Sequence, residues 1–168
     1  MQDKLKIGRI LISDLILEYL KERNVTFELY HHKPFHSCSD NDLNIQGTDV
    51  KNILLHSKKC DKVFLVVLPC SSRLSVKVLK KMTGCTDLEF APVDLCRKVL
   101  ACEPGSLSVL SLLVRQAKID IFFDNTVILE TVHLHPADNT KTLAIDCKTV
   151  ISLLNEKGYD VKTQTVSM

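Results

Sequence analysis

Tryptophan is absent from this chain of 168 residues, and aromatic side chains make up only 5% of it. A surface that stacks several nucleic-acid bases on aromatic rings is therefore poorly supported. Long apolar runs are missing too, because the longest, at residues 63–68, has the length of a strand and not of a membrane span. The N-terminal residues lack the apolar core and cleavage site of a secretory signal. These absences predict a cytoplasmic protein with no membrane partner.

Closely spaced cysteine pairs are also missing. The seven cysteines contain no Cys-x-x-Cys motif and stand at Cys38, Cys60, Cys70, Cys85, Cys96, Cys102 and Cys147. Structural zinc sites need ligands in close pairs, so no metal and no cofactor is predicted. Two groups could hold a metal, but ordinary loop and strand histidines are the simpler interpretation: His31, His32 and His36 with Cys38, and His133 with His135. We expect scattered, reduced and mostly buried thiols.

The composition is that of one globular domain, which we take to span residues 1–168. Hydrophobic residues make up 45% and charged residues 25%, which excludes a disordered chain. Positive charge is concentrated, since residues 51–81 hold eight basic and one acidic side chain, against 14 basic and 19 acidic elsewhere. Such a local field suits a polyanionic partner, although a solvated lysine-rich surface is the simpler alternative.

Periodicity predicts an α+β fold. Apolar residues recur at helical spacing from Ile12 to Leu20, and further helices are predicted at 75–83, 92–100 and 148–157. A short helix within 37–47 and a helical turn at 125–129 are also expected. Strands are predicted at 25–31, 51–56, 62–69, 88–90, 119–123, 131–135, 142–145 and, at an edge, 161–166. Because helices and strands are interspersed irregularly, we expect a mixed central β-sheet with helices packed on it.

Three polar segments stand out between these elements. Lys51 and Asn52 open an otherwise apolar strand, a Glu-Pro-Gly-Ser turn occupies residues 103–106, and a His-Pro-Ala-Asp-Asn-Thr loop occupies residues 135–140. Polar side chains at strand ends and in loops are common places for a binding or catalytic site. Taken singly, each has a plain structural explanation as surface charge, a turn or a packed loop histidine.

Four motifs occur together in the order of a known family. Lys-Asn-x-Leu-Leu from Lys51, Val-Val-Leu-Pro from Val66, Pro-Gly-Ser from Pro104 and His-Pro-x-x-Asn-Thr from His135 resemble the YbaK/ProX-like prolyl-tRNA editing domains. The pattern is most similar to the freestanding Ala-tRNA(Pro) deacylases and covers about residues 12–165. The resemblance implies a YbaK-like mixed sheet in a single domain.

The resemblance also implies a reaction and a set of site residues. Such domains hydrolyse the ester between a wrong amino acid and the 3′ end of tRNA(Pro), without a metal or a nucleophilic triad. The implied catalytic residues are Lys51 and Asn52. The implied substrate-binding residues are His135, Pro104, Gly105, Ser106 and Asn139. An oxyanion can be stabilised by amide, ammonium or loop N–H donors, and a small pocket can exclude bulky side chains.

The expected partner is the acceptor end of mischarged tRNA(Pro), with prolyl-tRNA synthetase as a possible second partner. The basic stretch would attract phosphates, which gives salt-dependent affinity. The residues assigned to this role are Lys58, Lys59, Arg73, Lys77, Lys80 and Lys81.

Residues 101–111 depart from the family pattern Gly-Val-x-Pro-Gly-Ser-Val-(Thr/Ser)-Pro-Phe-Gly. The first glycine is Ala101, and the second proline, the phenylalanine and the last glycine are also replaced. Alanine resists the left-handed backbone conformation that glycine adopts freely. Two alternatives therefore stay open: removal of Cys or of Ser/Thr, and an inactive relative that only binds tRNA or a synthetase. A cysteine hydrolase built on Cys102 and His135 is disfavoured, because nothing marks a nucleophile elbow.

Overall fold

The computed structural model describes residues 6–7 and 10–168 of the chain. The helices are α1 (Ile12–Glu22), α2 (Val76–Thr83), α3 (Val93–Leu100) and α4 (Cys147–Glu156), with 3-10 turns η2 (Cys38–Asp40), η3 (Pro104–Ser106) and η4 (Val109–Leu113). The strands are β1 (Lys6–Ile7), β2 (Ile10–Leu11), β3 (Phe27–His31), β4 (Thr48–Ser57), β5 (Lys62–Pro69), β6 (Glu89–Phe90), β7 (Asp120–Asp124), β8 (Thr131–Leu134), β9 (Lys141–Asp146) and β10 (Val161–Gln164).

Eight of these strands form one mixed sheet, as predicted. Its order is β10-β7-β5-β4-β8-β9-β3, with β6 paired to β4 beside this path, and β1 pairs with β2 separately. The β10–β7, β7–β5 and β4–β8 pairs are parallel, whereas β4–β5, β4–β6, β8–β9 and β9–β3 are antiparallel. The last strand lies at the sheet edge, which confirms the expectation for residues 161–166.

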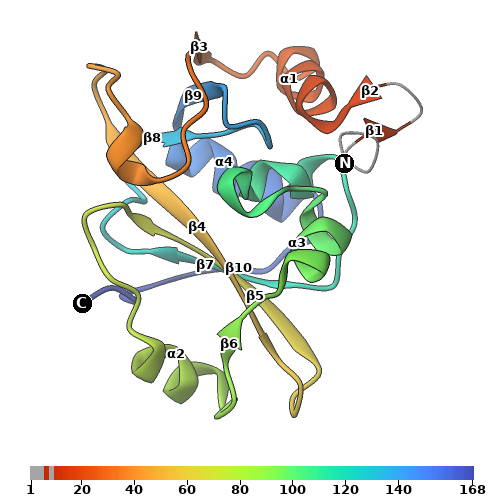
Figure 1. Cartoon of the computed structure of the whole chain (residues 1–168), viewed down its shortest axis with the longest axis vertical. Helices are drawn as coiled ribbons and strands as arrows, with labels where there is room; N and C mark the ends of the chain where they lie inside the picture. The colour runs from red at the N-terminus through yellow and green to blue at the C-terminus, as the bar shows by residue number, and fades with distance from the viewer. Residues whose placement is uncertain (1–5, 8–9) are drawn as a thin grey trace.

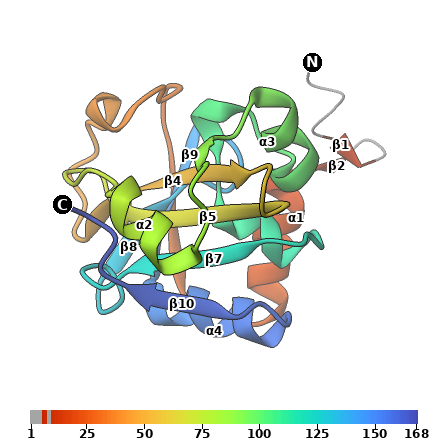
Figure 2. The ribbon, with the colours of Figure 1, turned by 90° about the horizontal axis from the view of Figure 1, so that it is seen from below.

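Helices cover both faces of the sheet (Figure 1). One large cluster of buried side chains joins α1, α3, α4 and η4 to one face, and a smaller cluster joins α2 to the other. In Figure 2, α2 lies in front of β5 and β7 while α1 and α4 lie behind the sheet. No helix in the described part of the chain is long and apolar enough to cross a membrane.

The longest strand, β4, has an interrupted edge. Along one side it pairs continuously with β5, from Val50 opposite Pro69 to Ser57 opposite Lys62. Along its other side it pairs with β8 at its first two residues and with β6 near its end, at Leu55 and His56. Residues 50–54 therefore have no strand beside them on that edge, within the described chain. Backbone and side chains of this stretch are available to line a site.

Several predicted elements are confirmed by their local chemistry. The Ser75 Oγ accepts a hydrogen bond from the Val78 N–H at 3.3 Å and so begins α2. Gly84 ends the helix with φ 73°, in the left-handed conformation that glycine tolerates. One boundary differs: the strand predicted at 51–56 begins earlier, at Thr48. Lys51 and Asn52 therefore lie inside the strand and not at its first residues.

Two local predictions are wrong, and one element was missed. The segment 37–47 forms only the turn η2, because the Asp40 carboxylate accepts the His36 and Ser37 N–H groups and Asn41 accepts that of Leu43. Such side-chain bonds to the backbone replace helical ones. Residues 125–129 are turns without a helix. The buried turn η4 was not foreseen, since its mostly apolar sequence is too short to show a helical period.

Candidate functional site

A cavity of about 160 Å³ opens against the unpaired edge of β4. Four consecutive β4 residues line it, together with the segment before β4, the end of β5, the loop after α3 and strands β8 and β9. The lining residues are Phe35, His36, Ser37, Cys38, Asn41, Asp49, Val50, Lys51, Asn52, Cys70, Pro104, Gly105, Leu107, His133, His135 and Thr142. Four predicted site residues, those of the Lys-Asn motif with Pro104 and Gly105, thus join His135 around one cavity.

Asn52 has a fixed amide. The Asn52 side chain lies on the same face of β4 as Leu54, which belongs to the large core. Its Oδ1 accepts a hydrogen bond from the Val109 N–H at 2.9 Å. A backbone N–H can only donate, so the amide orientation is determined by this contact. The Nδ2 group makes no hydrogen bond in the described chain, which leaves two N–H donors free beside the cavity. Preorganised donors of this kind can stabilise a developing oxyanion.

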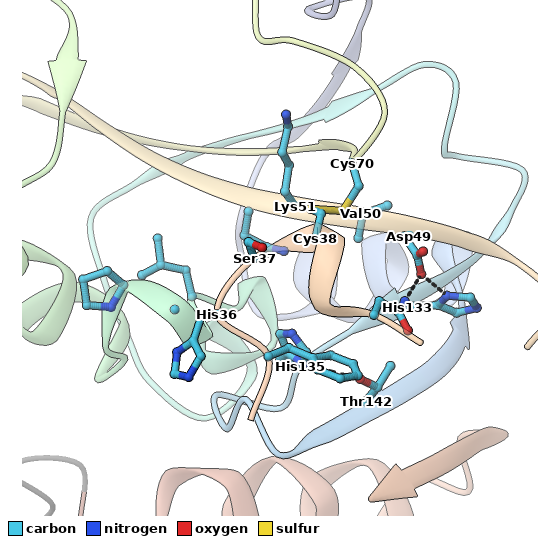
Figure 3. A pocket seen from close by; sticks show the side chains of 16 residues that line it. His36, Ser37, Cys38, Asp49, Val50, Lys51, Cys70, His133, His135 and Thr142 are labelled. Carbon is cyan, nitrogen blue, oxygen red and sulfur yellow. Dashed lines mark hydrogen bonds and ion pairs between the residues drawn. A yellow bond between two sulfur atoms is a disulfide. The ribbon is translucent and has the colours of Figure 1, made fainter. Parts of the chain in front are cut away.

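Lys51 lies on the other face of the same strand, because successive strand residues alternate. Its neighbour two residues on, Ile53, packs against the α2 side of the sheet. In Figure 3 the Lys51 side chain extends away from His135 and Thr142. No ion pair of Lys51 occurs among the described residues. The two residues of the motif therefore approach the cavity from different sides, and Lys51 lies at its rim.

His135 is held in one tautomer at the other wall. Its Nδ1 lies 2.8 Å from the Lys141 carbonyl oxygen, which can only accept, so Nδ1 carries the proton. Burial lowers the pKa of His135 below its ordinary value of 6.5, because desolvation penalises the imidazolium, although the Lys141 contact opposes this. The ring is then neutral near pH 7, and Nε2 offers a lone pair to a donor.

An aromatic group beside His135 was missed by the sequence analysis. The rings of His32 and Phe35 stack at 3.7 Å, and His32 Nε2 lies 2.7 Å from Thr142 Oγ1. Asn139, predicted to bind substrate, does not line the cavity. Its Nδ2 donates to the Phe35 carbonyl oxygen at 3.1 Å, so it holds this aromatic group in place. No spacing in the sequence indicates these contacts, because β3 and β9 become neighbours only in the sheet.

The Pro-Gly-Ser turn reaches the cavity through Pro104 and Gly105. Ser106 is buried and donates to the Glu103 carbonyl oxygen at 3.3 Å, outside the lining. Glu103 in turn pairs with Arg97 of α3 through two hydrogen bonds of 2.8 and 3.0 Å, which fixes the turn to the helix. Ala101 ends α3 at φ 52° and ψ 36°, the left-handed conformation that alanine resists.

The expectation of reduced, separate thiols is wrong for four of the seven cysteines. Cys38 bonds to Cys70 and Cys60 to Cys85, with Cα–Cα distances of 5.9 and 6.1 Å. Their sequence separations of 32 and 25 give no local signal, because η2 meets the end of β5, and the β4–β5 turn meets the segment after α2, only in the folded chain. The cysteine pattern therefore no longer supports a reducing compartment.

The remaining cysteines, Cys96, Cys102 and Cys147, are free and buried, as predicted. Burial raises the pKa of the Cys102 thiol to about 11. Cys102 does not line the cavity, so the structure gives no support to a cysteine nucleophile. No group of three or more potential ligands suited to a metal occurs in residues 6–7 and 10–168. His133 and His135 instead make separate hydrogen bonds, to Asp49 and to Lys141.

The basic residues assigned to tRNA lie on one side of the sheet. Lys77, Lys80 and Lys81 belong to α2, Arg73 to the loop before it, and Lys58 and Lys59 to the β4–β5 turn, all of them at least partly exposed. The face of β4 that carries Lys51 also carries Leu55, which packs in the α2 cluster. Positive charge thus extends from the cavity rim across the α2 side of the molecule.

The aminoacyl-tRNA editing domain is the family model that matches this chain, over residues 40–153. The chain belongs to the aminoacyl-tRNA editing domain family. The matched stretch includes the whole β4 edge and all four motifs, so the resemblance drawn from them is confirmed at family level. The editing domain described here is accordingly a hydrolase of the aminoacyl-tRNA deacylase class. A search of curated proteins finds no significant match to the sequence.

Solved structures share the fold of this editing domain. A hypothetical protein, APE2540, superposes with a TM-score of 0.75 at 16% identity, covering 91% of this chain and 99% of its own. A candidate trans-editing enzyme for prolyl-tRNA synthetase gives 0.70 at 13% identity, with 90% and 95% covered. A candidate signal transduction protein from Marinobacter aquaeolei VT8 gives 0.62 at 14% identity, with 92% and 30% covered. At these identities the likeness establishes the YbaK-like fold.

Proposed function

We propose that this editing domain removes a small amino acid, alanine, from mischarged tRNA(Pro), and that it does so without a metal. The observation that carries the proposal is the cavity between the fixed amide of Asn52 and the neutral ring of His135. The candidate trans-editing enzyme among the structural neighbours, which is linked to prolyl-tRNA synthetase, adds support for the tRNA. Prolyl-tRNA synthetase is a second proposed partner, which would deliver the mischarged tRNA.

The proposed reaction is ester hydrolysis. A water adds to the ester carbonyl carbon, and the Asn52 Nδ2 group donates to the oxyanion that forms. The bond from this carbon to the ribose oxygen then breaks, and that oxygen takes up the proton lost by the water. His135 Nε2 accepts a hydrogen bond from the attacking water or from a ribose hydroxyl. The products are free amino acid and tRNA with a restored hydroxyl group.

Selection of the amino acid follows from the walls of the cavity. Phe35 and His135, with ring centroids 6.2 Å apart, limit the space for a side chain, so alanine fits and bulkier groups are excluded. Pro104 and Gly105 line the cavity, and their backbone groups would bind the aminoacyl end. Lys51, at the rim, would bind a phosphate of the terminal nucleotides.

The test is a deacylation assay with Ala-, Ser-, Cys- and Pro-tRNA(Pro), with and without a chelator. We expect Ala-tRNA(Pro) to be hydrolysed fastest, Pro-tRNA(Pro) to survive and the chelator to change nothing. Asn52→Ala should lower kcat about a hundredfold, which is typical for loss of an oxyanion donor. Lys51→Ala should mainly raise KM, and Lys118→Ala, an exposed lysine outside the cavity, serves as the matched control.

Each failure points to a different alternative. Faster loss of Cys- or Ser-tRNA(Pro) would replace alanine by that amino acid. Survival of every mischarged species would overturn the proposed reaction, and retained tRNA binding would then favour a tRNA- or synthetase-binding module.

A further inference from the structure

Four aromatic or imidazole rings line the cavity, and three of them are already engaged. The four belong to Phe35, His36, His133 and His135. Phe35 is buried and stacks on the His32 ring at 3.7 Å. His133 is buried and lies 2.6 Å from the Asp49 carboxylate, whereas His135 forms the wall beside the proposed ester site. These three rings therefore belong to the walls of the cavity.

The His36 ring differs from the other three. His36 is exposed, and its side chain makes no hydrogen bond, ion pair or ring contact among the residues that the structure describes. In Figure 3 it lies on the same side of β4 as His135, whereas Lys51 extends to the opposite side. The ring is thus free to contact a group that enters the cavity near His135. The sequence analysis considered His36 only as one member of a possible metal group.

The backbone that carries this ring is fixed on both sides. The Phe35 N–H donates to the Asn139 carbonyl oxygen at 2.9 Å, and Asn139 Nδ2 donates back to the Phe35 carbonyl oxygen at 3.1 Å. The His36 N–H donates to Asp40 Oδ2 at 2.7 Å, and Cys38, two residues on, is tied by its disulfide to the residue after β5. A free ring on a fixed backbone has little conformational freedom to lose when a ligand binds, so it is preorganised for binding.

We propose that the His36 ring stacks on the base of the 3′-terminal nucleotide of the tRNA. The inference rests on the proposed function. When Asn52 and His135 hold the ester, the ribose that carries it lies at the opening of the cavity, and its base lies no further away than one nucleoside. An exposed, unengaged ring can stack on any base, because every base has a π face. One such ring suits one base, which agrees with an aromatic content of only 5%.

The parts of one terminal nucleotide would then meet separate residues. The ester carbonyl lies against Asn52, the base on His36 and the 5′-phosphate toward Lys51. Asn52 and Lys51 project from opposite faces of β4, and His36 belongs to the segment before that strand, so the three contacts diverge as the groups of a nucleotide do around its ribose. His36 is accordingly a substrate-binding residue that places the ester through the base. An ester without a base loses this contact, although its reactive group is unchanged.

The experiment compares two inhibitors of Ala-tRNA(Pro) hydrolysis by the full chain. One is adenosine with alanine joined to its 3′ position by an amide, which resists hydrolysis, and the other is the same alanylamino ribose without a base. We expect the wild-type protein to bind the adenosine compound roughly tenfold to a hundredfold more tightly, the range of one stack between a base and a ring. His36→Ala should bring the two affinities close together, and His36→Phe, which keeps a flat ring, should retain the difference.

The matched control is His31→Ala, which removes an exposed histidine of β3 outside the cavity lining and should retain the difference. An unchanged difference in His36→Ala, in a variant that melts like the wild type, would overturn the inference while leaving the deacylase proposal intact. Equal inhibition of the wild type by the two compounds, or inhibition by neither, would overturn it as well. A wild-type protein that does not hydrolyse Ala-tRNA(Pro) would instead overturn the proposed function itself.

Discussion

Individual residues of the cavity have separate tasks that their adjacency in sequence hides. Lys51 and Asn52 are neighbours, yet strand geometry sends their side chains to opposite faces of β4. Asn52 is fixed by Val109 and has unused N–H donors, whereas Lys51 has no ion pair in the described chain. The two residues should therefore affect different kinetic constants, kcat for Asn52 and KM for Lys51.

His135 gives a pH dependence whose direction follows from its burial. The pKa of His135 is lowered from 6.5, so the neutral ring persists to lower pH than for an exposed histidine. We expect kcat to be constant through neutral pH and to fall only as pH drops below 6.5, where Nε2 becomes protonated. Folding stability should decline in the same direction, because the unfolded chain takes up this proton more readily.

The measurement is a profile of kcat against pH for the wild type and for His135→Gln. In the variant, we expect kcat to be lower at neutral pH and not to fall further as the pH drops below 6.5. An acid limb that is the same in both proteins would show that another group titrates.

At the scale of elements, the cavity is assembled by connections between segments. The η2 segment carries Phe35, His36 and Ser37 along one wall, and the Cys38–Cys70 disulfide fastens it to the end of β5. Arg97 and Glu103 fasten the opposite wall to α3. Both connections join residues close to the cavity, so losing either should widen it before the sheet is affected.

Reduction of the Cys38–Cys70 disulfide by a dithiol should therefore lower activity. With a separation of 32 residues, the cross-link stabilises the folded state by about 3–4 kcal/mol in a chain-entropy model. Faster hydrogen exchange at residues 35–47, with activity several-fold lower, is the expected result. The Cys60–Cys85 disulfide, between the hairpin turn and the segment after α2, supplies the control.

Cys38→Ser should abolish the response of activity to reductant, and Cys60→Ser should preserve it. A response that disappears with Cys60→Ser instead would assign the effect to the hairpin.

Considered as a whole, the molecule concentrates its positive charge in one region. The net charge is only +2, yet residues 51–81 carry the excess of positive side chains, and they gather around α2 and the β4–β5 hairpin. The hairpin turn lies about 20 Å along β4 from Lys51. Lys58 and Lys59 can therefore contact only a more distant part of the same polyanion. Lys80 and Lys81 also lie in the last turn of α2, where they stabilise the helix dipole.

Salt titrations of tRNA binding should show whether the positively charged region around α2 contacts the tRNA. Affinity should fall with rising salt, and Lys80→Glu/Lys81→Glu should weaken binding further and reduce the slope of log K against log salt by about 1 to 2. Lys118→Glu/Lys148→Glu changes the same charge at exposed positions outside residues 51–81 and should have a smaller effect. Binding that both pairs of changes weaken equally would mean that the α2 side does not face the tRNA.

The sequence by itself determined the mixed sheet, most helices and strands, and four motifs that mark the family. These depend on local periodicity, on caps such as Ser75 and Gly84, and on residue order, all of which are visible in a linear chain. It also indicated Asn52, His135 and the Pro104–Gly105 turn, because each belongs to such a motif.

Only the tertiary structure decided which side chains surround Asn52, His135 and the Pro104–Gly105 turn. The disulfides, the His32–Phe35 stack, and the pairing of Asp49 with His133 join residues 3 to 84 positions apart. The pairing of β4 with β8 brings Asp49 to His133, and strand order leaves no trace in local periodicity. The gap along the β4 edge, where the cavity opens, has the same origin: β8 ends its pairing at Asp49 and β6 begins at Leu55.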